Sequence, residues 1–206
     1  MPGQLSPRSR VIESNEVSSR GRPEGGNDTD LALLDRYRQG DRRAFTELVV
    51  RYHRPLYNAA FWILRSAEDA NDVTQIVFLR VAERLDEFDP RYKFFSWIYR
   101  IAVNESLNLL RRNDREEALD DEADWPGPDD ANPETRASDA ESSRRIHGAM
   151  MRMPANDRAV LALRHFSECS YQEIAQILGL DEKTVKSRLF DARHRLRDML
   201  QDLRAN

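Results

Sequence analysis

Positively charged side chains are concentrated in the last helical segment that the sequence predicts, from Glu182 to Leu203. Cationic side chains gathered on one side of a helix suit the phosphates and base edges of a DNA major groove. The alternative is an ordinary helical hairpin with a solvated face, although such a face usually mixes the two signs evenly. The cationic and imidazole side chains are Lys183, Lys186, Arg188, Arg193, His194, Arg195 and Arg197.

The residues just before this segment have the spacing of a helix-turn-helix. Ser170 and Glu173 form a capping box that opens a short helix, and Ala175 is small where two helices must approach closely. Gly179 stands where the turn needs a left-handed residue, and Asp181 is expected to cap the next helix. The basic segment is therefore predicted to be the recognition helix of a duplex-DNA reader.

A second polar face lies on a helix predicted over residues 94–112. Arg and Asn side chains recur there every three or four residues, which suits contacts to phosphates and base edges. The alternative is the solvated side of an amphipathic helix. The residues are Arg100, Asn104, Asn108, Arg111 and Arg112.

Aromatic side chains lie at the start of this helix and in the loop before it. Such rings are suited to stacking on the bases of single-stranded DNA. Trp97 and Phe94 or Phe95 are expected to belong to the core instead. Tyr92, which falls in a predicted loop over residues 86–93, is the better candidate for base stacking.

These candidate sites belong to two predicted all-α bundles joined by an acidic flexible linker. The chain of 206 residues has 32 basic and 36 acidic residues. Residues 115–141 hold eleven acidic residues and two arginines, a net charge of −9, so the rest of the chain carries +5. Residues 1–28 are rich in Ser, Gly, Pro and Arg and are predicted to be a disordered leader.

The helices of the first bundle have recognisable start and stop signals. Gly40 should end the first helix, Asp41 should cap the second, and Ser66 should open the third. Pro55 should kink or restart the second helix, because proline lacks an N–H group. No run of alternating polarity indicates a strand.

Other classes of protein fit the sequence poorly. The four histidines have no metal-ligand spacing, and no phosphate-binding loop or nucleophile elbow is present, so we expect no enzyme activity, metal or cofactor. Cys169 is expected to be a packing residue, with a redox sensor as the alternative. No apolar run approaches the roughly 20 residues that span a bilayer, so we expect a soluble protein with no membrane insertion. The single cysteine cannot form an internal disulfide, which indicates a reducing compartment.

Three segments, in this order, resemble the extracytoplasmic-function (ECF) sigma factors, group IV of the sigma-70 family. Asp69–Arg80 is similar to their polymerase-binding helix, Phe95–Asn104 to their promoter-opening helix, and Ser170–Arg188 to their C-terminal DNA reader. The resemblance covers the chain from about Leu31 to Leu203. A duplex-DNA regulator without polymerase docking, or a structural helical adaptor, leaves some of these matches unexplained.

The resemblance implies a function and a set of site residues. The chain would bind core RNA polymerase and promoter DNA in the bacterial cytoplasm, under the control of an anti-sigma factor. Polymerase docking would use Asp69, Asp72, Gln75 and Phe78. The melted minus-10 element would be captured by Asp89, Tyr92, Lys93, Arg100, Asn104, Asn108, Arg111 and Arg112. The duplex minus-35 element would be read by Lys183, Thr184, Lys186, Ser187, Arg188 and Arg193.

The resemblance also assigns the parts of the chain. Residues 29–113 would be sigma region 2, residues 114–139 the linker and residues 140–206 sigma region 4. The linker would either mimic nucleic-acid charge inside the polymerase or serve as a plain spacer. Two residues depart from the family pattern: Ile76 replaces a usual Glu, and Asp191 replaces a usual Arg. Asp191 would face away from DNA, pair with a cation one turn distant, or change the promoter that is read.

Overall fold

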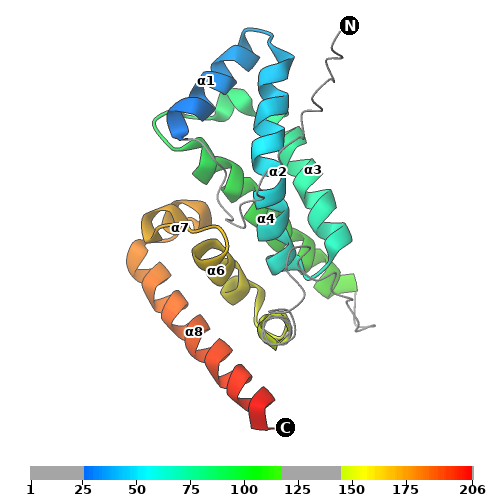
Figure 1. The fold of residues 1–206 in the computed structure, drawn as a ribbon, viewed down its shortest axis with the longest axis vertical. Helices are drawn as coiled ribbons and strands as arrows, with labels where there is room; N and C mark the ends of the chain where they lie inside the picture. Colours follow the sequence, from blue (N-terminus) through cyan, green and yellow to red (C-terminus); the bar gives the residue numbers. More distant parts are fainter. Residues whose placement is uncertain (1–25, 117–144, 206) are drawn as a thin grey trace, which may run out of the picture.

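The computed structural model describes residues 26–116 and 145–205, and within these ranges it contains helices and no strand (Figure 1). Most of the predicted leader and linker lies outside the described residues. The N-terminal unit consists of α1 (Asn27–Arg38), α2 (Arg42–Leu64), α3 (Ala67–Glu83), the short 3-10 helix η1 (Leu85–Glu87) and α4 (Phe94–Glu116). The C-terminal unit consists of helical residues 145–151, α6 (Ala155–His165), α7 (Tyr171–Leu178) and α8 (Glu182–Ala205).

The predicted end of α1 and the predicted starts of α2 and α3 are confirmed. Gly40 follows α1 with a left-handed φ of 97°, a conformation that glycine adopts without steric cost. The Asp41 side chain accepts a hydrogen bond from the N–H of Arg43 at the start of α2. The Ser66 hydroxyl accepts one from the N–H of Asp69 at the start of α3. Each cap satisfies an N–H group that the helix leaves without a partner.

The expected restart at Pro55 does not occur, because α2 is one continuous helix from Arg42 to Leu64. Pro55 is buried inside it. The apolar side chains on both sides of the proline, Tyr52 and Leu56 among them, are buried in the same core. This shared packing holds the two halves of the helix together despite the missing hydrogen bond.

The first helix begins at Asn27, two residues before the predicted boundary of the N-terminal domain. The Asn27 side-chain carbonyl accepts a hydrogen bond from the N–H of Phe94, at 3.0 Å, so α1 caps the start of α4. Asp30 is buried in the same helix, where it pairs with Arg51 at 2.5 Å and accepts a hydrogen bond from the Tyr52 hydroxyl at 2.6 Å. Burial is the main cause that raises the pKa of Tyr52. These bonds fix α1 against α2 and α4.

The two units pack against each other along two lines of contact (Figure 1). Helix α6 lies against α2, and α7 lies against α4. The rings of Trp62 and Phe166 stack with their centroids 4.2 Å apart. Helix α8 packs on α6 and α7, on the side of the C-terminal unit away from α4.

Within the described residues, no helix combines the length and apolar character that crossing a bilayer requires.

Candidate nucleic-acid and polymerase interfaces

The predicted helix-turn-helix is present in the C-terminal unit. Ser170 and Glu173 form a complete capping box at the start of α7. Gly179 ends α7 in the left-handed region, with φ of 66° and ψ of 38°. At the start of α8, the Asp181 carboxylate accepts hydrogen bonds from the N–H and the hydroxyl of Thr184, and these bonds lower the pKa of Asp181. The turn between the two helices is thus fixed at both ends.

One side of α8 is buried and the other faces solvent. Val185, Leu189 and Ala192 are buried in the core of the C-terminal unit. Helices advance by about 100° per residue, so the opposite side carries Lys183 and Ser187, and both of these side chains are exposed. The N-terminal half of α8 therefore presents polar side chains outward, as a recognition helix requires.

Some predicted minus-35 residues have other contacts. The Thr184 hydroxyl belongs to the Asp181 cap. The Arg193 guanidinium lies 3.4 Å from Nε2 of His165 in α6. Arg188 is half-buried, and Lys186 is exposed. Arg193 is exposed, so its assignment to the minus-35 element stays a prediction.

Phe190 was not identified from the sequence, although it lies on the outward side of α8. Its side chain is 60% exposed, and its ring centroid lies 4.0 Å from that of His194. Helix geometry alone could have identified it. Successive residues are about 100° apart around the helix axis, so Phe190 does not share the buried side that contains Leu189. An exposed aromatic ring among polar side chains offers apolar contact to a partner, such as the methyl group of thymine.

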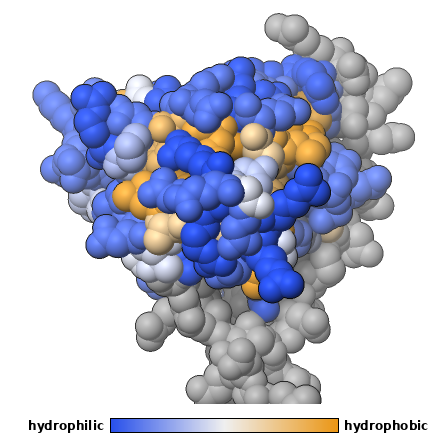
Figure 2. Space-filling model, turned by 90° about the horizontal axis from the view of Figure 1, so that it is seen from above, coloured by the Kyte–Doolittle hydropathy of each residue, from blue (hydrophilic) through white to orange (hydrophobic). Residues whose placement is uncertain are grey.

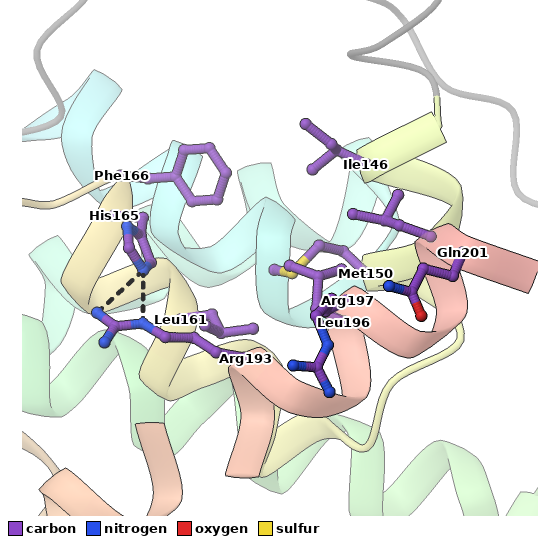
Figure 3. Close-up of a pocket in the computed structure, with 10 residues that line it drawn as sticks. Ile146, Met150, Leu161, His165, Phe166, Arg193, Leu196, Arg197 and Gln201 are labelled. Carbon is purple, nitrogen blue, oxygen red and sulfur yellow. Dashed lines mark hydrogen bonds between the residues drawn. The ribbon is translucent and has the colours of Figure 1, made fainter. Parts of the chain in front are cut away.

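An apolar groove of about 450 Å³ lies between residues 145–151, α6 and α8 (Figure 3). Its apolar lining includes Ile146, Met150 and Leu196. Arg193 and Arg197 also line it, and the dashed lines in Figure 3 join Arg193 to His165. Burial and the neighbouring arginines lower the pKa of His165.

The predicted polar face of α4 is present. The side of α4 that faces the core carries Phe94 and Phe95, which are buried as expected. Trp97 is half-buried and packs against Phe88 and Phe94. The exposed side chains are those of Arg100, Asn104, Asn108, Arg111 and Arg112. All five predicted residues therefore share one solvent-facing side of the helix.

The loop before α4 presents an aromatic side chain and an ion pair. Tyr92 is 56% exposed, so its ring is available for stacking. Asp89 pairs with Arg91 at 2.5 Å, and the Arg91 guanidinium lowers the pKa of Asp89. Arg91, which the sequence reasoning missed, has a more exposed side chain than Lys93, the other cation of this loop.

The C-terminal unit contacts two of the predicted minus-10 residues. Nζ of Lys93 lies 3.0 Å from a carboxylate oxygen of Glu173, the capping residue of α7. A guanidinium nitrogen of Arg100 lies 4.0 Å from the position that a Cβ atom would occupy at Gly179. The helix-turn-helix thus covers one end of the polar face of α4.

Helix α3 presents the predicted polymerase-docking residues together with apolar ones. Asp72 and Gln75 are exposed, and Asp69 is half-buried. Phe78 is 8% exposed and packs with the rings of Phe45 and His53, so its side chain supports α3 from within rather than facing a partner.

The sequence reasoning did not identify Leu79, whose side chain is 63% exposed on the same side of α3 as Asp72. Ile76 is also exposed beside them. Figure 2 shows that apolar areas lie among hydrophilic side chains at the end of the molecule where α1 lies, so exposed apolar surface is not confined to α3. An apolar and acidic mixture on one helix face is typical of a protein-binding surface.

The described residues contain no cluster of metal-binding side chains. No group of three His, Cys, Asp or Glu side chains is arranged to hold a metal ion in residues 26–116 and 145–205. Cys169 is fully buried, in agreement with a packing role.

Models of known families match both units. The sigma-70 region 2 model matches residues 48–116, and the sigma-70 region 4 model matches residues 143–196. The first match covers most of α2 and all of α3 and α4. The second covers residues 145–151, α6, α7 and α8 as far as Leu196.

Relatives and a solved structure agree with these matches. The chain is 32% identical to the RNA polymerase sigma-H factor of Pseudomonas aeruginosa, over 84% of this chain and 95% of the relative. It is 31% identical to the ECF RNA polymerase sigma factor SigW of Bacillus subtilis, over 82% of this chain and 96% of SigW. The structure of CnrH in complex with the cytosolic domain of CnrY is similar, with a TM-score of 0.65 and 28% identity over 85% of this chain and 99% of CnrH.

These matches confirm the resemblance drawn from the three sequence segments. Sigma factors are non-enzymatic initiation factors: they direct RNA polymerase to promoter DNA and so start transcription at specific sites. With both regions present and the relatives matched over nearly their whole length, the chain belongs to the ECF RNA polymerase sigma factors.

Proposed function

We propose that this sigma factor reads the minus-35 element as duplex DNA with the outward side of α8. The exposed face of Lys183, Ser187 and Phe190 on a helix-turn-helix is the observation that carries this assignment. Cationic side chains there would neutralise phosphates, and each good bidentate contact to a base would contribute about 1–3 kcal/mol.

The minus-10 element would be captured as single strands by the loop before α4 and the polar face of α4. Tyr92 offers an exposed ring, and Asn104 and Arg100 offer donors and acceptors nearby. Taking a base out of the duplex costs a few kcal/mol, which stacking and pocket contacts would offset. Because Glu173 holds Lys93 and α7 lies against α4, full use of Lys93 in this capture would involve movement of α7 away from α4.

Core polymerase would dock on the exposed side of α3. Asp72 and Gln75 supply polar contacts there, and Leu79 supplies apolar area. Neither DNA contact would be strong alone, but docking both units on one polymerase raises the effective concentration of the second contact. The protein would thus act in the bacterial cytoplasm, with no activity of its own as an enzyme.

A protein inhibitor, an anti-sigma factor, would control this activity. CnrH, which shares the fold and 28% of its residues with this chain, is bound by the cytosolic domain of another protein. A partner that keeps α7 against α4 would prevent capture of the minus-10 strand.

Run-off transcription with core RNA polymerase and the full chain tests this proposal. The polymerase with this chain should give a transcript of defined length from a cognate promoter, found by screening genomic fragments. Core enzyme alone should give none. Failure of the complex to form, or the same transcripts with and without this chain, would refute the proposed function.

A further inference from the structure

Asp191 is a carboxylate on the side of α8 that carries the reading residues. Successive residues of an α-helix are about 100° apart around the helix axis. Asp191 therefore lies about 40° from Ser187 and about 160° from the buried Leu189 around the axis of α8. Its side chain is exposed. The structure therefore does not turn Asp191 toward the core of the C-terminal unit.

No cation neutralises Asp191 among the described residues. Of the two arginines one turn away, Arg195 forms an ion pair with Asp157 of α6 instead, and Arg188 makes no ion pair with Asp191. The other acidic side chains described on α8 do have partners: Glu182 lies 3.9 Å from Lys186, and Asp198 lies 3.0 Å from Arg197.

An unpaired carboxylate on a DNA-facing helix has two possible effects. Near a phosphate it repels the backbone and weakens binding to every sequence. Near the base edges of the major groove it accepts a hydrogen bond from an amino group, and Asp and Glu pair in this way with N4 of cytosine. The position of Asp191, one turn beyond Ser187 on the outward side, favours the second effect.

We propose that Asp191 is a specificity-determining residue that selects cytosine within the duplex promoter element. This inference rests on the proposed function, in which α8 enters the major groove. The carboxylate would accept the amino hydrogen of that cytosine, and bases that present an acceptor at the same place, such as thymine or guanine, would be rejected by electrostatic repulsion.

The test uses the full chain assembled with core polymerase and a pool of duplexes randomised across the upstream promoter element. Retained duplexes are sequenced for the wild type and for Asp191→Asn, Asp191→Arg and Asp191→Ala. The wild type should enrich cytosine at one position by about fivefold or more. The Asn variant should shift that preference toward adenine and the Arg variant toward guanine, because these are the bases that each side chain pairs with. The Ala variant should lose the preference.

Asp198→Asn is the matched control, since it removes an exposed carboxylate two turns further along the same helix. It should leave the base profile unchanged. If the Asp191 variants keep the wild-type profile and bind all duplexes more tightly, the carboxylate only repels phosphate and the inference is overturned. If the wild-type complex enriches no duplex sequence at all, the proposed function fails together with the inference.

Discussion

The guanidinium of Arg158, in α6, donates hydrogen bonds to the backbone carbonyl of Ile63 at 2.9 and 2.5 Å. Ile63 lies in the last turn of α2, where carbonyl groups have no partner within the helix and a positive charge is stabilising. That turn contains no basic residue of its own. Arg158, only 4% exposed, therefore caps a helix of the N-terminal unit from the C-terminal unit.

The first prediction concerns this contact between the two units. Arg158→Met should lower the free energy of unfolding by about 2 kcal/mol, because hydrogen bonds from a charged donor to buried carbonyls are lost. It should also loosen α6 from α2. Spin labels at Thr46→Cys and Gln172→Cys, both exposed positions, would measure the distance between the units.

Arg164→Met is the control for that experiment. Arg164 lies on the same helix but donates to the carbonyl of Cys169, within the C-terminal unit. Arg164→Met should lower the free energy of unfolding without broadening the distribution of distances between the units. Equal distance distributions for the wild type and Arg158→Met would show that Arg158 does not hold the units together.

The second prediction concerns the ion pair of Lys93 and Glu173. Glu173→Gln keeps an oxygen that can accept the Ser170 N–H, so the capping box should survive while the ion pair is lost. The Lys93 amine should then react severalfold faster with an acetylating reagent, as measured by mass spectrometry. Glu182→Gln, beside Lys186 at 3.9 Å, should leave the reactivity of Lys93 unchanged. An unchanged rate in Glu173→Gln would mean that the carboxylate does not protect the amine.

The third prediction concerns pH. Burial lowers the pKa of His147, and the charge of Arg65 lowers it further; burial and two arginines lower the pKa of His165. The folded protein therefore favours neutral rings, and the unfolded chain binds more protons. Stability should be fully present above pH of about 6.5 and should fall as the pH decreases below it.

Urea denaturation at pH 7.5 and 5.5 would measure this loss of stability. His147→Gln and His165→Gln should each reduce the difference between the two pH values, and the double variant should reduce it most. A double variant with the same pH dependence as the wild type would assign the effect to other groups.

The fourth prediction concerns Phe190. Because its side chain is exposed, Phe190→Ala should change the free energy of unfolding by less than about 0.5 kcal/mol. The substitution should still weaken binding of the polymerase complex to its promoter severalfold, because the ring no longer offers apolar contact to the major groove of the DNA. Promoter binding measured by filter retention checks this, with Val50→Ala, an exposed apolar residue of α2, as the control. If Phe190→Ala and Val50→Ala weakened promoter binding equally, Phe190 would not be part of the DNA interface.

The sequence by itself determined the local structure of this protein. Gly40, Ser66 and the Ser170–Glu173 capping box act through neighbouring backbone groups, so their positions were sufficient to place helix ends. The spacing of polar residues likewise identified the exposed side of α4, because helix geometry fixes which residues share a face.

Only the tertiary structure decided which of these side chains are available. Phe78 is buried in the core, whereas Arg193 contacts His165 of α6 and stays exposed. Helix α2 continued through Pro55 because its two halves share one core. The contact of Arg158 with Ile63 joins residues 95 positions apart, and no local pattern encodes such a pair, since it depends on how two separately formed units meet.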